Sequence, residues 1–556
     1  MSIQSNNYFS QSPSINIGRS TFPLDHNVKT TFNAGDLIPF DVVEVLPGDT
    51  FDWTSSILCR MQPSVHPTMD TAFLDYYYFF VPGRLTWKNF ESFFGESDPS
   101  AWTTPYDGMI PRMLLTGYEQ GDLSHTTADY MGLPIINQNQ GSAGQMLVNA
   151  LPFRAYQLIW NYFFRDENLE DALLVSDADS VSSAEVTSLL KVQKVNKVHD
   201  YFTSSLPAPQ KGPSVMLPPE LLNTGNSVYP QGTPVIFGSN VMTNGSFLPA
   251  SLGQPNFTNN VGVNSSGVLQ ASSGKLVLNA TTPGSQATYL SNAYSAAGFS
   301  INDLRQAYAI QSLLERDARG GTRYGEILAS HFGVRPSFAV LQQPEFLGGD
   351  RIYINMSQVE QTSPTSYGEG QASSPIGSVA GQSKTVNRAH SFTKSFEEHG
   401  WVIGVACVRT KHSYQYGLHR MWSRQTRYDF YYPELANIGE QPVMQNEIYF
   451  TDSLNNKNVF GYQEAWAEYR YQPDTVTGQF RHNAKGGSLD SWHYADVYSA
   501  PPTLKADWLY ETSANIDRTL AVTSSVSDQF LCDMYFDVKA TRPMPVYSIP
   551  GLGRSW

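Results

Sequence analysis

The fold class depends first on residues 75–81, which read Asp-Tyr-Tyr-Tyr-Phe-Phe-Val. Six of these seven side chains are aromatic or β-branched, and such side chains favour the pleated surface of a β-strand. The Pro82-Gly83 pair that follows supplies turn chemistry. The sequence therefore predicts a strand here, and the density of bulky side chains predicts that most of it is covered.

Other segments have the same character. Residues 401–408 are almost wholly apolar and rich in β-branched side chains, so we expect a strand covered on both faces. Residues 530–539 alternate between apolar and more polar side chains, which is the period of a strand between a core and a more polar face. Residues 37–46 and 51–53, separated by a Pro-Gly-Asp-Thr turn, extend the pattern. The chain is therefore predicted to be mainly β.

Helical periodicity is confined to a few segments. The clearest covers residues 301–316, where apolar side chains recur at helical spacing before a Gly-Gly pair at 320 and 321. Weaker helices are predicted over residues 150–164 and 184–199.

The composition points to an assembly. The 556 residues contain 36 Lys and Arg against 50 Asp and Glu, a formal net charge of −14. Charged residues make up 15%, below the roughly 25% of a typical soluble domain, while aromatic residues reach 13%. A lone subunit would expose unusually few charges for its size. We therefore expect a large assembly that buries much of each subunit.

The composition also excludes several classes. Three cysteines are too few for a disulfide framework. The N-terminus lacks the charged and apolar regions of a signal peptide, and no apolar run approaches the roughly twenty residues of a membrane span. We expect a soluble, non-exported chain without membrane insertion.

One long segment differs from the rest. Residues 212–299 contain only two charged residues, Glu220 and Lys275, amid Asn, Ser, Thr, Gly and Pro. Apolar side chains persist, so we expect an ordered insertion of short strands and long loops; the alternative is an unstructured linker. The expected organisation is an extended N-terminal arm over 1–35, a body over 36–211 and 300–540, the insertion over 212–299, and an extended C-terminal arm over 541–556.

No motif predicts catalysis. The eleven histidines follow no metal-ligand spacing, and Glu397-Glu398-His399 is sequential, so its side chains would diverge in a strand. Residues 377–385 imitate a phosphate-binding loop but lack its adjacent Gly-Lys. We expect no catalytic residue, no metal site and no cofactor.

One basic run has the composition of a nucleic-acid contact. Cationic and aromatic side chains are interleaved from residue 409 to residue 428, with no acid before Asp429, which suits the phosphates and exposed bases of single-stranded DNA. The candidate DNA contacts are Arg409, Lys411, Arg420, Trp422, Arg424 and Arg427. The alternative is that these arginines pair with acids on a neighbouring subunit.

Several ordered blocks carry a family resemblance. The longest reads Leu-Glu-Arg-Asp-Ala-Arg-Gly-Gly-Thr-Arg-Tyr at 314–324, and the others are residues 47–51, 76–82, 344–349 and 430–434. Together they resemble the major capsid protein of the Microviridae, small icosahedral single-stranded DNA bacteriophages, and specifically of the gokushovirus branch. The resemblance runs from about residue 20 to the end of the chain, outside the variable stretches.

The resemblance implies an all-β fold, an eight-stranded antiparallel jelly roll of the viral capsid type with long loop insertions and a few short helices. It implies pentamers and a closed T=1 icosahedral shell of about sixty copies around a circular single-stranded DNA genome. A small basic DNA-binding phage protein would condense the DNA, and assembly would take place in the host bacterial cytoplasm.

The resemblance also implies that residues 212–299 form a protrusion at the three-fold axes that meets a host cell-surface receptor. The candidate host contacts are Asn244, Phe247, Asn256, Phe257, Asn259 and Asn264. Two other functions stay open at this point. Surplus aromatics and low charge also suit a carbohydrate-binding or carbohydrate-active β-sandwich, and the basic run suits a protein that chiefly binds nucleic acid, although the net charge opposes it.

Overall fold

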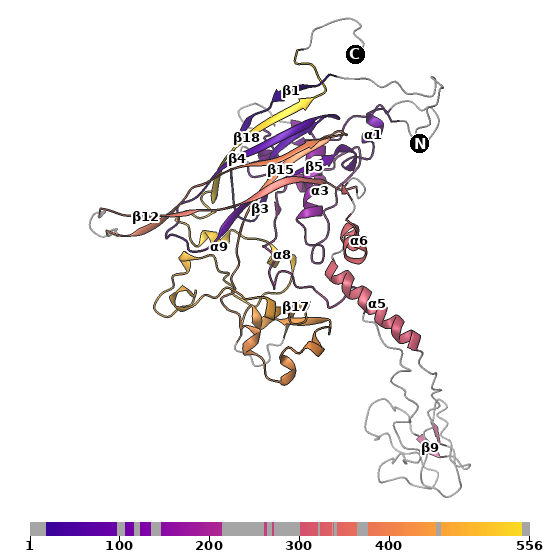
Figure 1. Cartoon of the computed structure of the whole chain (residues 1–556), viewed down its shortest axis with the longest axis vertical. Helices are drawn as coiled ribbons and strands as arrows, with labels where there is room; N and C mark the ends of the chain where they lie inside the picture. The colour runs from indigo at the N-terminus through magenta and orange to yellow at the C-terminus, as the bar shows by residue number, and fades with distance from the viewer. Residues whose placement is uncertain are drawn as a thin grey trace. The chain divides into compact units, whose positions relative to one another are not determined.

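A computed structural model gives the structure of the chain (Figure 1). The described residues are 18–96, 106–115, 123–134, 146–213, 261–263, 269–271, 301–320, 323–335, 337–338, 342–363, 376–451 and 458–547. The chain divides into two compact units. The first comprises Met1–Lys211 with Arg316–Trp556, and the second comprises Gly212–Glu315.

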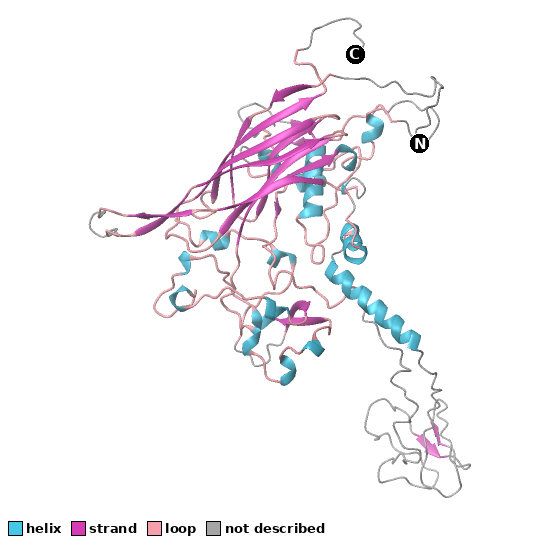
Figure 2. Ribbon diagram, viewed as in Figure 1, coloured by secondary structure: helices cyan, strands magenta, loops and turns pink. Residues whose placement is uncertain are grey.

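The first unit is built on two five-stranded antiparallel sheets, counted over the described residues (Figures 1 and 2). In the first sheet, β18 pairs on one side with β1 and β2 and on the other with β4, and β4 pairs with β14. Its strands are β1 (Ser20–Pro23), β2 (His26–Phe32), β4 (Thr50–Met61), β14 (Thr385–Ser395) and β18 (Phe530–Arg542).

The second sheet has the order β11-β5-β15-β3-β8. Its strands are β3 (Asp36–Val45), β5 (Ala72–Pro82), β8 (Gln193–Lys194), β11 (Glu345–Tyr353) and β15 (Gly400–Thr410). Strands far apart in the sequence are therefore neighbours in both sheets. The first sheet joins the two ends of the described chain, because β1 and β2 both lie beside β18.

The two sheets differ in how they are covered. Along β4 and β18, buried side chains alternate with more exposed ones, so the first sheet has one inner and one outer face. Nearly every side chain of β5 and β15 is buried. Their inner face packs on the first sheet, and their outer face packs on α3 (Leu151–Phe163). The second sheet is thus the middle layer of the unit.

Aromatic side chains fill the space between the sheets. The Trp53 ring of β4 lies 5.3 Å from the Tyr78 ring of β5, and the Phe40 ring of β3 stacks at 5.5 Å on Phe536 of β18. The Trp53 indole N–H donates to the Tyr78 hydroxyl oxygen at 3.1 Å, and that hydroxyl lies 2.8 Å from Ser55 Oγ. Burial raises the pKa of Tyr78 well above its ordinary value, although the bonds to Ser55 and Trp53 act against this. Tyr78 therefore remains a neutral hydrogen-bonding group inside the core.

Two long segments leave this framework and return to it. The first connects β5 to β11 and the second connects β15 to β18. In the first unit, the first segment contains η2 (Gly83–Leu85), α1 (Phe90–Phe93), β6 (Arg112–Leu115), α2 (Thr127–Tyr130), β7 (Met146–Asn149), α3, α4 (Ser183–Leu190), β8 and α6 (Tyr324–Phe332).

The second long segment, residues 411–529, is made mostly of short turns and loops. Its elements are η5 (Arg420–Trp422), η6 (Arg427–Asp429), η7 (Pro433–Leu435), β16 (Glu440–Met444), η8 (Gln445–Glu447), β17 (Val459–Glu464), η9 (Ala467–Arg470), η10 (Gly478–Phe480), η11 (Asp490–Trp492), α8 (Ala506–Leu509) and α9 (Ala514–Asp517). A separate ribbon, β12 (Met356–Glu360) with β13 (Val379–Ser383), lies between β11 and β14 along the chain.

The second unit includes β9 (Val261–Val263) paired antiparallel with β10 (Leu269–Ala271). It also includes the first part of α5 (Ile301–Gly320), and the boundary between the units falls within this helix. Much of residues 212–299 lies outside the described residues, and the expected domain boundaries stay predictions. Residues 20–32, expected as part of the N-terminal arm, pair as β1 and β2 in the first sheet.

The prediction of a mainly β chain with antiparallel sheets and few helices is confirmed. The helix predicted over 301–316 is confirmed and continues to Gly320, and the helix predicted over 150–164 is α3. The helix predicted over 184–199 is wrong beyond Leu190. Gln193 and Lys194 instead pair with β3, because Leu37 and Asp36 offer strand partners that sequence periodicity does not reveal.

We predict that Tyr78→Phe lowers the free energy of unfolding by about 1–3 kcal/mol, because it leaves the buried Trp53 indole N–H without its acceptor. Urea unfolding, followed by tryptophan fluorescence, measures this change. Tyr535→Phe is the matched control, since Tyr535 is 40% exposed on the outer face of β18. Equal midpoints for the two variants would contradict a structural role for the Tyr78 hydroxyl.

Candidate functional site

The basic run begins at the end of β15, where Arg409 forms an ion pair with a buried carboxylate. Its guanidinium is paired with Asp75 of β5, whose side chain is fully buried, and it also donates to the Tyr77 hydroxyl at 3.3 Å. Arg351 of β11 approaches the same carboxylate at 2.7 Å. Three neighbouring strands are thus joined by one carboxylate and two guanidiniums. Arg409 is committed to this cluster.

Lys411 is also paired, but at the surface. Its Nζ lies 2.7 Å from an oxygen of Asp474, and the two side chains are 62% and 45% exposed. An exposed pair of this kind is worth about 0–1 kcal/mol, so Lys411 can exchange its partner at little cost.

Arg420 and Arg424 share acidic partners. Glu468 lies 3.1 Å from Arg424 and 3.9 Å from Arg420, and Glu447 lies 3.6 Å from Arg420. Both carboxylates are buried. Burial raises the pKa of Glu447 to about 7, against the lowering effects of the Met444 N–H and the Arg420 charge. The acidic partners of these arginines thus come from the same chain.

Trp422 and Arg427 are placed differently. Trp422 is 70% exposed, and the Arg427 guanidinium lies 5.2 Å from the centre of the Tyr432 ring. Arg427 has no ion pair among the described residues. Four of the six candidate DNA contacts therefore have an acidic partner within the chain. Trp422, Arg427 and the surface-paired Lys411 are accessible. The DNA contact stays a prediction.

Sequence reasoning missed a buried ionic network at the start of the second long segment. His412 lies 3.0 Å from Asp496 through Nδ1 and 2.9 Å from Glu511 through Nε2. Lys197 lies 3.7 Å from Asp496, and Asn515 donates to the same carboxylate. All five side chains are buried. The network ties the end of β15 to Asp496, to Glu511 and to Asn515 of α9, and to the chain near β8.

The charges of this network fix its protonation state. Burial by itself would lower the pKa of His412, but the charges of Asp496 and Glu511 and their hydrogen bonds outweigh it and raise the pKa to about 10. Burial would likewise raise the pKa of Asp496, but His412 and Lys197 hold it well below its ordinary value. His412 is therefore a buried cation at neutral pH.

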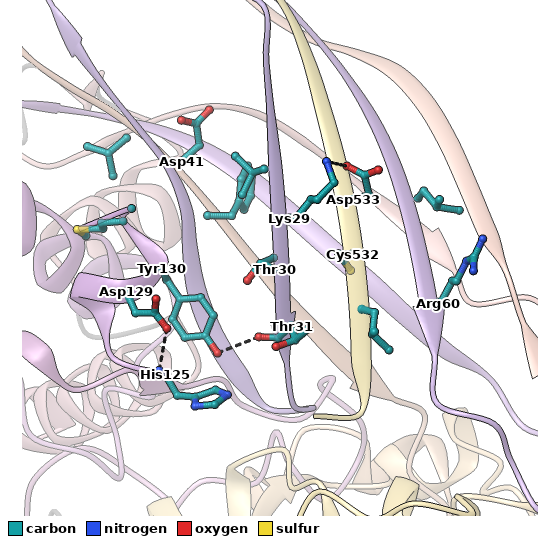
Figure 3. Close-up of a pocket in the computed structure, with 17 residues that line it drawn as sticks. Lys29, Thr30, Thr31, Asp41, Arg60, His125, Asp129, Tyr130, Cys532 and Asp533 are labelled. Atoms are coloured by element: carbon teal, nitrogen blue, oxygen red, sulfur yellow. Dashed lines mark hydrogen bonds and ion pairs between the residues drawn. The ribbon is translucent and has the colours of Figure 1, made fainter. Parts of the chain in front are cut away.

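An open groove with a volume of about 770 Å³ is lined by residues of β2, β3, β4, β18 and the chain around α2 (Figure 3). Figure 3 shows Tyr130 of α2 pointing toward Thr31 of β2, and its hydroxyl donates to the Thr31 carbonyl oxygen at 3.0 Å. Lys29 pairs with Asp533 at 3.6 Å across β2 and β18. These contacts join α2 to β2 and β2 to β18 beside the groove.

Within the described residues, no cluster of histidine, cysteine and acidic side chains could hold a metal ion. A search of the same residues finds no helix with the length and apolarity needed to span a bilayer. The six candidate host contacts at 244, 247, 256, 257, 259 and 264 all lie outside the described residues.

Comparison with known proteins decides the family. The model of a family described as capsid protein (F protein) matches residues 10–552. The chain belongs to this phage capsid protein family. This capsid protein is 38% identical to capsid protein VP1 of Bdellovibrio phage phiMH2K, over 98% of this chain and 97% of that protein. It is also 38% identical to capsid protein VP1 of Chlamydia phage 1, over 99% and 98%.

A third relative is capsid protein VP1 of Spiroplasma virus 4, which is 37% identical over 98% of this chain and 97% of that protein. The predicted resemblance to capsid proteins of the Microviridae is therefore confirmed. The capsid protein is a structural component of a virion rather than an enzyme.

The buried network predicts a defined pH dependence of stability. Because the folded-state pKa of His412 is raised to about 10, its contribution is complete below about pH 6.5 and is lost as the pH rises through 10. Because the pKa of Asp496 is lowered, its contribution is present above about pH 4 and is lost at lower pH. The combined contribution of His412 and Asp496 to stability should therefore be greatest between about pH 4 and about pH 6.5.

We predict that His412→Gln lowers the free energy of unfolding by about 3–5 kcal/mol at pH 6, since it leaves two buried carboxylates with too little positive charge. The deficit should shrink toward pH 10, where wild-type His412 loses its proton. Urea unfolding at both pH values measures this. His390→Gln, at a 55% exposed histidine, is the control. A deficit independent of pH would contradict a charged His412.

Proposed function

We propose that this chain is the major structural subunit of a small icosahedral bacteriophage capsid, in which about sixty copies enclose a circular single-stranded DNA genome. The observation that carries the proposal is the family match over residues 10–552. The sparse charge and abundant aromatic side chains support it, because a shell subunit buries much of its surface against its neighbours.

We also propose that the two sheets form an eight-stranded jelly roll. The eight long strands are, in chain order, β2, β3, β4, β5, β11, β14, β15 and β18. If these strands are numbered from one to eight in chain order, their spatial order is 1-8-3-6 in one sheet (β2-β18-β4-β14) and 2-7-4-5 in the other (β3-β15-β5-β11). This interleaving supports a double-sheet jelly roll with its strands shared between two sheets. The two long segments are then insertions between the fourth and fifth and between the seventh and eighth strands.

The negative net charge of the chain supports a role for a separate basic protein in condensing the genome. A chain with a net charge of −14 does not neutralise DNA by itself, so a small basic DNA-binding phage protein would condense the genome. Assembly would take place in the host cytoplasm. The almost uncharged residues 212–299 would form the three-fold protrusion that contacts a host cell-surface receptor. The capsid family match favours this function over the carbohydrate-binding alternative.

The solution mass of the purified chain and of one variant tests the proposal. We predict that replacing residues 225–290 with a short linker leaves folding and shell formation intact, because this range belongs to the second compact unit. Adsorption of variant phage to host cells should fall.

The readouts are sedimentation velocity, for pentamers or megadalton shells, and a plaque adsorption assay. Wild-type material that stays near 61.8 kDa under every condition would contradict the shell function. Loss of soluble variant would instead place the segment in the folding core.

A further inference from the structure

Part of the second long segment exposes an ordered aromatic cluster. Phe430, Tyr431 and Tyr469 are 50%, 47% and 51% exposed. The Tyr431 ring lies 6.3 Å from Tyr469 and 5.9 Å from Trp466, and the Trp466 indole donates to the Leu435 carbonyl oxygen at 2.8 Å. These contacts fix the rings from below while their outer faces remain open. The cluster is therefore held in place before any partner arrives.

A guanidinium lies among these rings. The Arg424 guanidinium carbon is 4.2 Å from the centre of the Tyr469 ring and 5.6 Å from that of Phe430. Its charge is balanced by Glu468 at 3.1 Å. Cation–π contacts and the ion pair together hold one orientation. Arg424, whose side chain is only 10% exposed, thus supports the rings as a fixed and neutralised cation.

Two more exposed aromatics flank this cluster along the same stretch of chain. Trp422 in η5 is 70% exposed, and Tyr428 in η6 is 75% exposed. We define the aromatic patch as Arg424 with the five rings Trp422, Tyr428, Phe430, Tyr431 and Tyr469. At about 200 Å² per residue, the exposed fractions of the five aromatic residues sum to about 600 Å².

This summed exposed area is comparable with the largest apolar patches of monomers and is about three quarters of what one partner of a standard interface contributes. The largest apolar patch on a typical monomer is about 300–600 Å², whereas each partner of a standard interface contributes about 800 Å². Trp, Tyr and Arg are also the residues that most often dominate binding energy at such interfaces. Residues 420–440 contain no lysine, which interfaces disfavour.

The charges of the patch argue for a protein partner over DNA. Residues 420–440 contain three arginines and three acids, Asp429, Glu434 and Glu440. Glu447 and Glu468 lie beneath them, beside Arg420 and Arg424. A phosphate backbone is held by cations whose charge is not already balanced. Arg420 and Arg424 are already paired with these two acids, and Arg427 is the one arginine of the stretch without an ion pair among the described residues.

We propose that the aromatic patch is a contact surface for a second copy of this chain. The inference rests on the proposed shell function, in which copies of this chain must meet one another, and it names one surface at which they do. The near-neutral charge lets two acidic chains approach here without repulsion, and the rings supply the apolar area.

The test compares two double variants of the full-length chain. Trp422→Ser with Tyr428→Ser removes the two most exposed rings of the patch. Leu174→Ser with Val386→Ser, at residues that are 92% and 62% exposed and lie outside residues 411–529, removes apolar surface elsewhere and is the matched control. Circular dichroism and thermal unfolding establish that each variant folds. Sedimentation velocity then measures the fraction of subunits in pentamers or shells.

We expect the patch variant to fold as the wild type does, and its assembled fraction at a fixed subunit concentration to fall at least tenfold, with the control unchanged. If the patch variant assembles normally while the wild type also assembles, the patch proposal is wrong and the shell function stands. If the wild type itself never assembles, the shell function fails.

Two further outcomes would overturn the proposal. One is an equal loss of assembly in the control, which would reveal a general effect of surface polarity. The other is normal shell formation by the patch variant with reduced retention of single-stranded DNA, which would make the patch a genome contact. Trp422→Lys, a single change at a 70% exposed position, gives a second reading should the double variant misfold.

Discussion

The structure depends on the packing of two antiparallel sheets through a layer of aromatic side chains. Trp53 and Tyr78 meet at the centre of that layer, joined by a hydrogen bond as well as by ring contact. Phe40 and Phe536 extend it, bringing an early strand against the last one. Since β2 pairs along its whole length with the first part of β18, the two ends of the described chain are held in one sheet. The intervening segments must then leave this framework and return to it.

This constraint assigns different tasks to different parts of the chain. The two sheets enclose the main hydrophobic core, and the segment between β15 and β18 carries exposed aromatic side chains. The buried network of His412, Asp496 and Glu511 fastens the base of that segment to the end of β15. A firmly anchored segment can hold exposed rings in fixed positions, which is what repeated contacts between identical subunits require. Arg420 and Arg424 add to this anchoring through Glu447 and Glu468.

Local pattern predicted strands β3, β4, β5, β15 and β18 but not β2, β11 or β14, and it predicted the polar clusters poorly. Strands such as β5, β15 and β18 are recognisable because their composition or period is contained within about ten residues. The partners of His412 lie 84 and 99 residues further along the chain, so no spacing in the sequence reveals them. The basic run looked like surplus positive charge for the same reason. Glu447, Glu468 and Asp474 lie outside it in sequence but beside it in space.

The central claim is that a two-sheet framework carries long segments that make the contacts of a shell. Electron cryomicroscopy of the chain expressed alone tests it most directly. The account predicts closed particles in which the framework has the sheet order described here and residues 411–529 form much of the boundary between neighbouring subunits. Particles whose subunits meet only through the faces of the sheets, with that segment pointing into solvent, would contradict it.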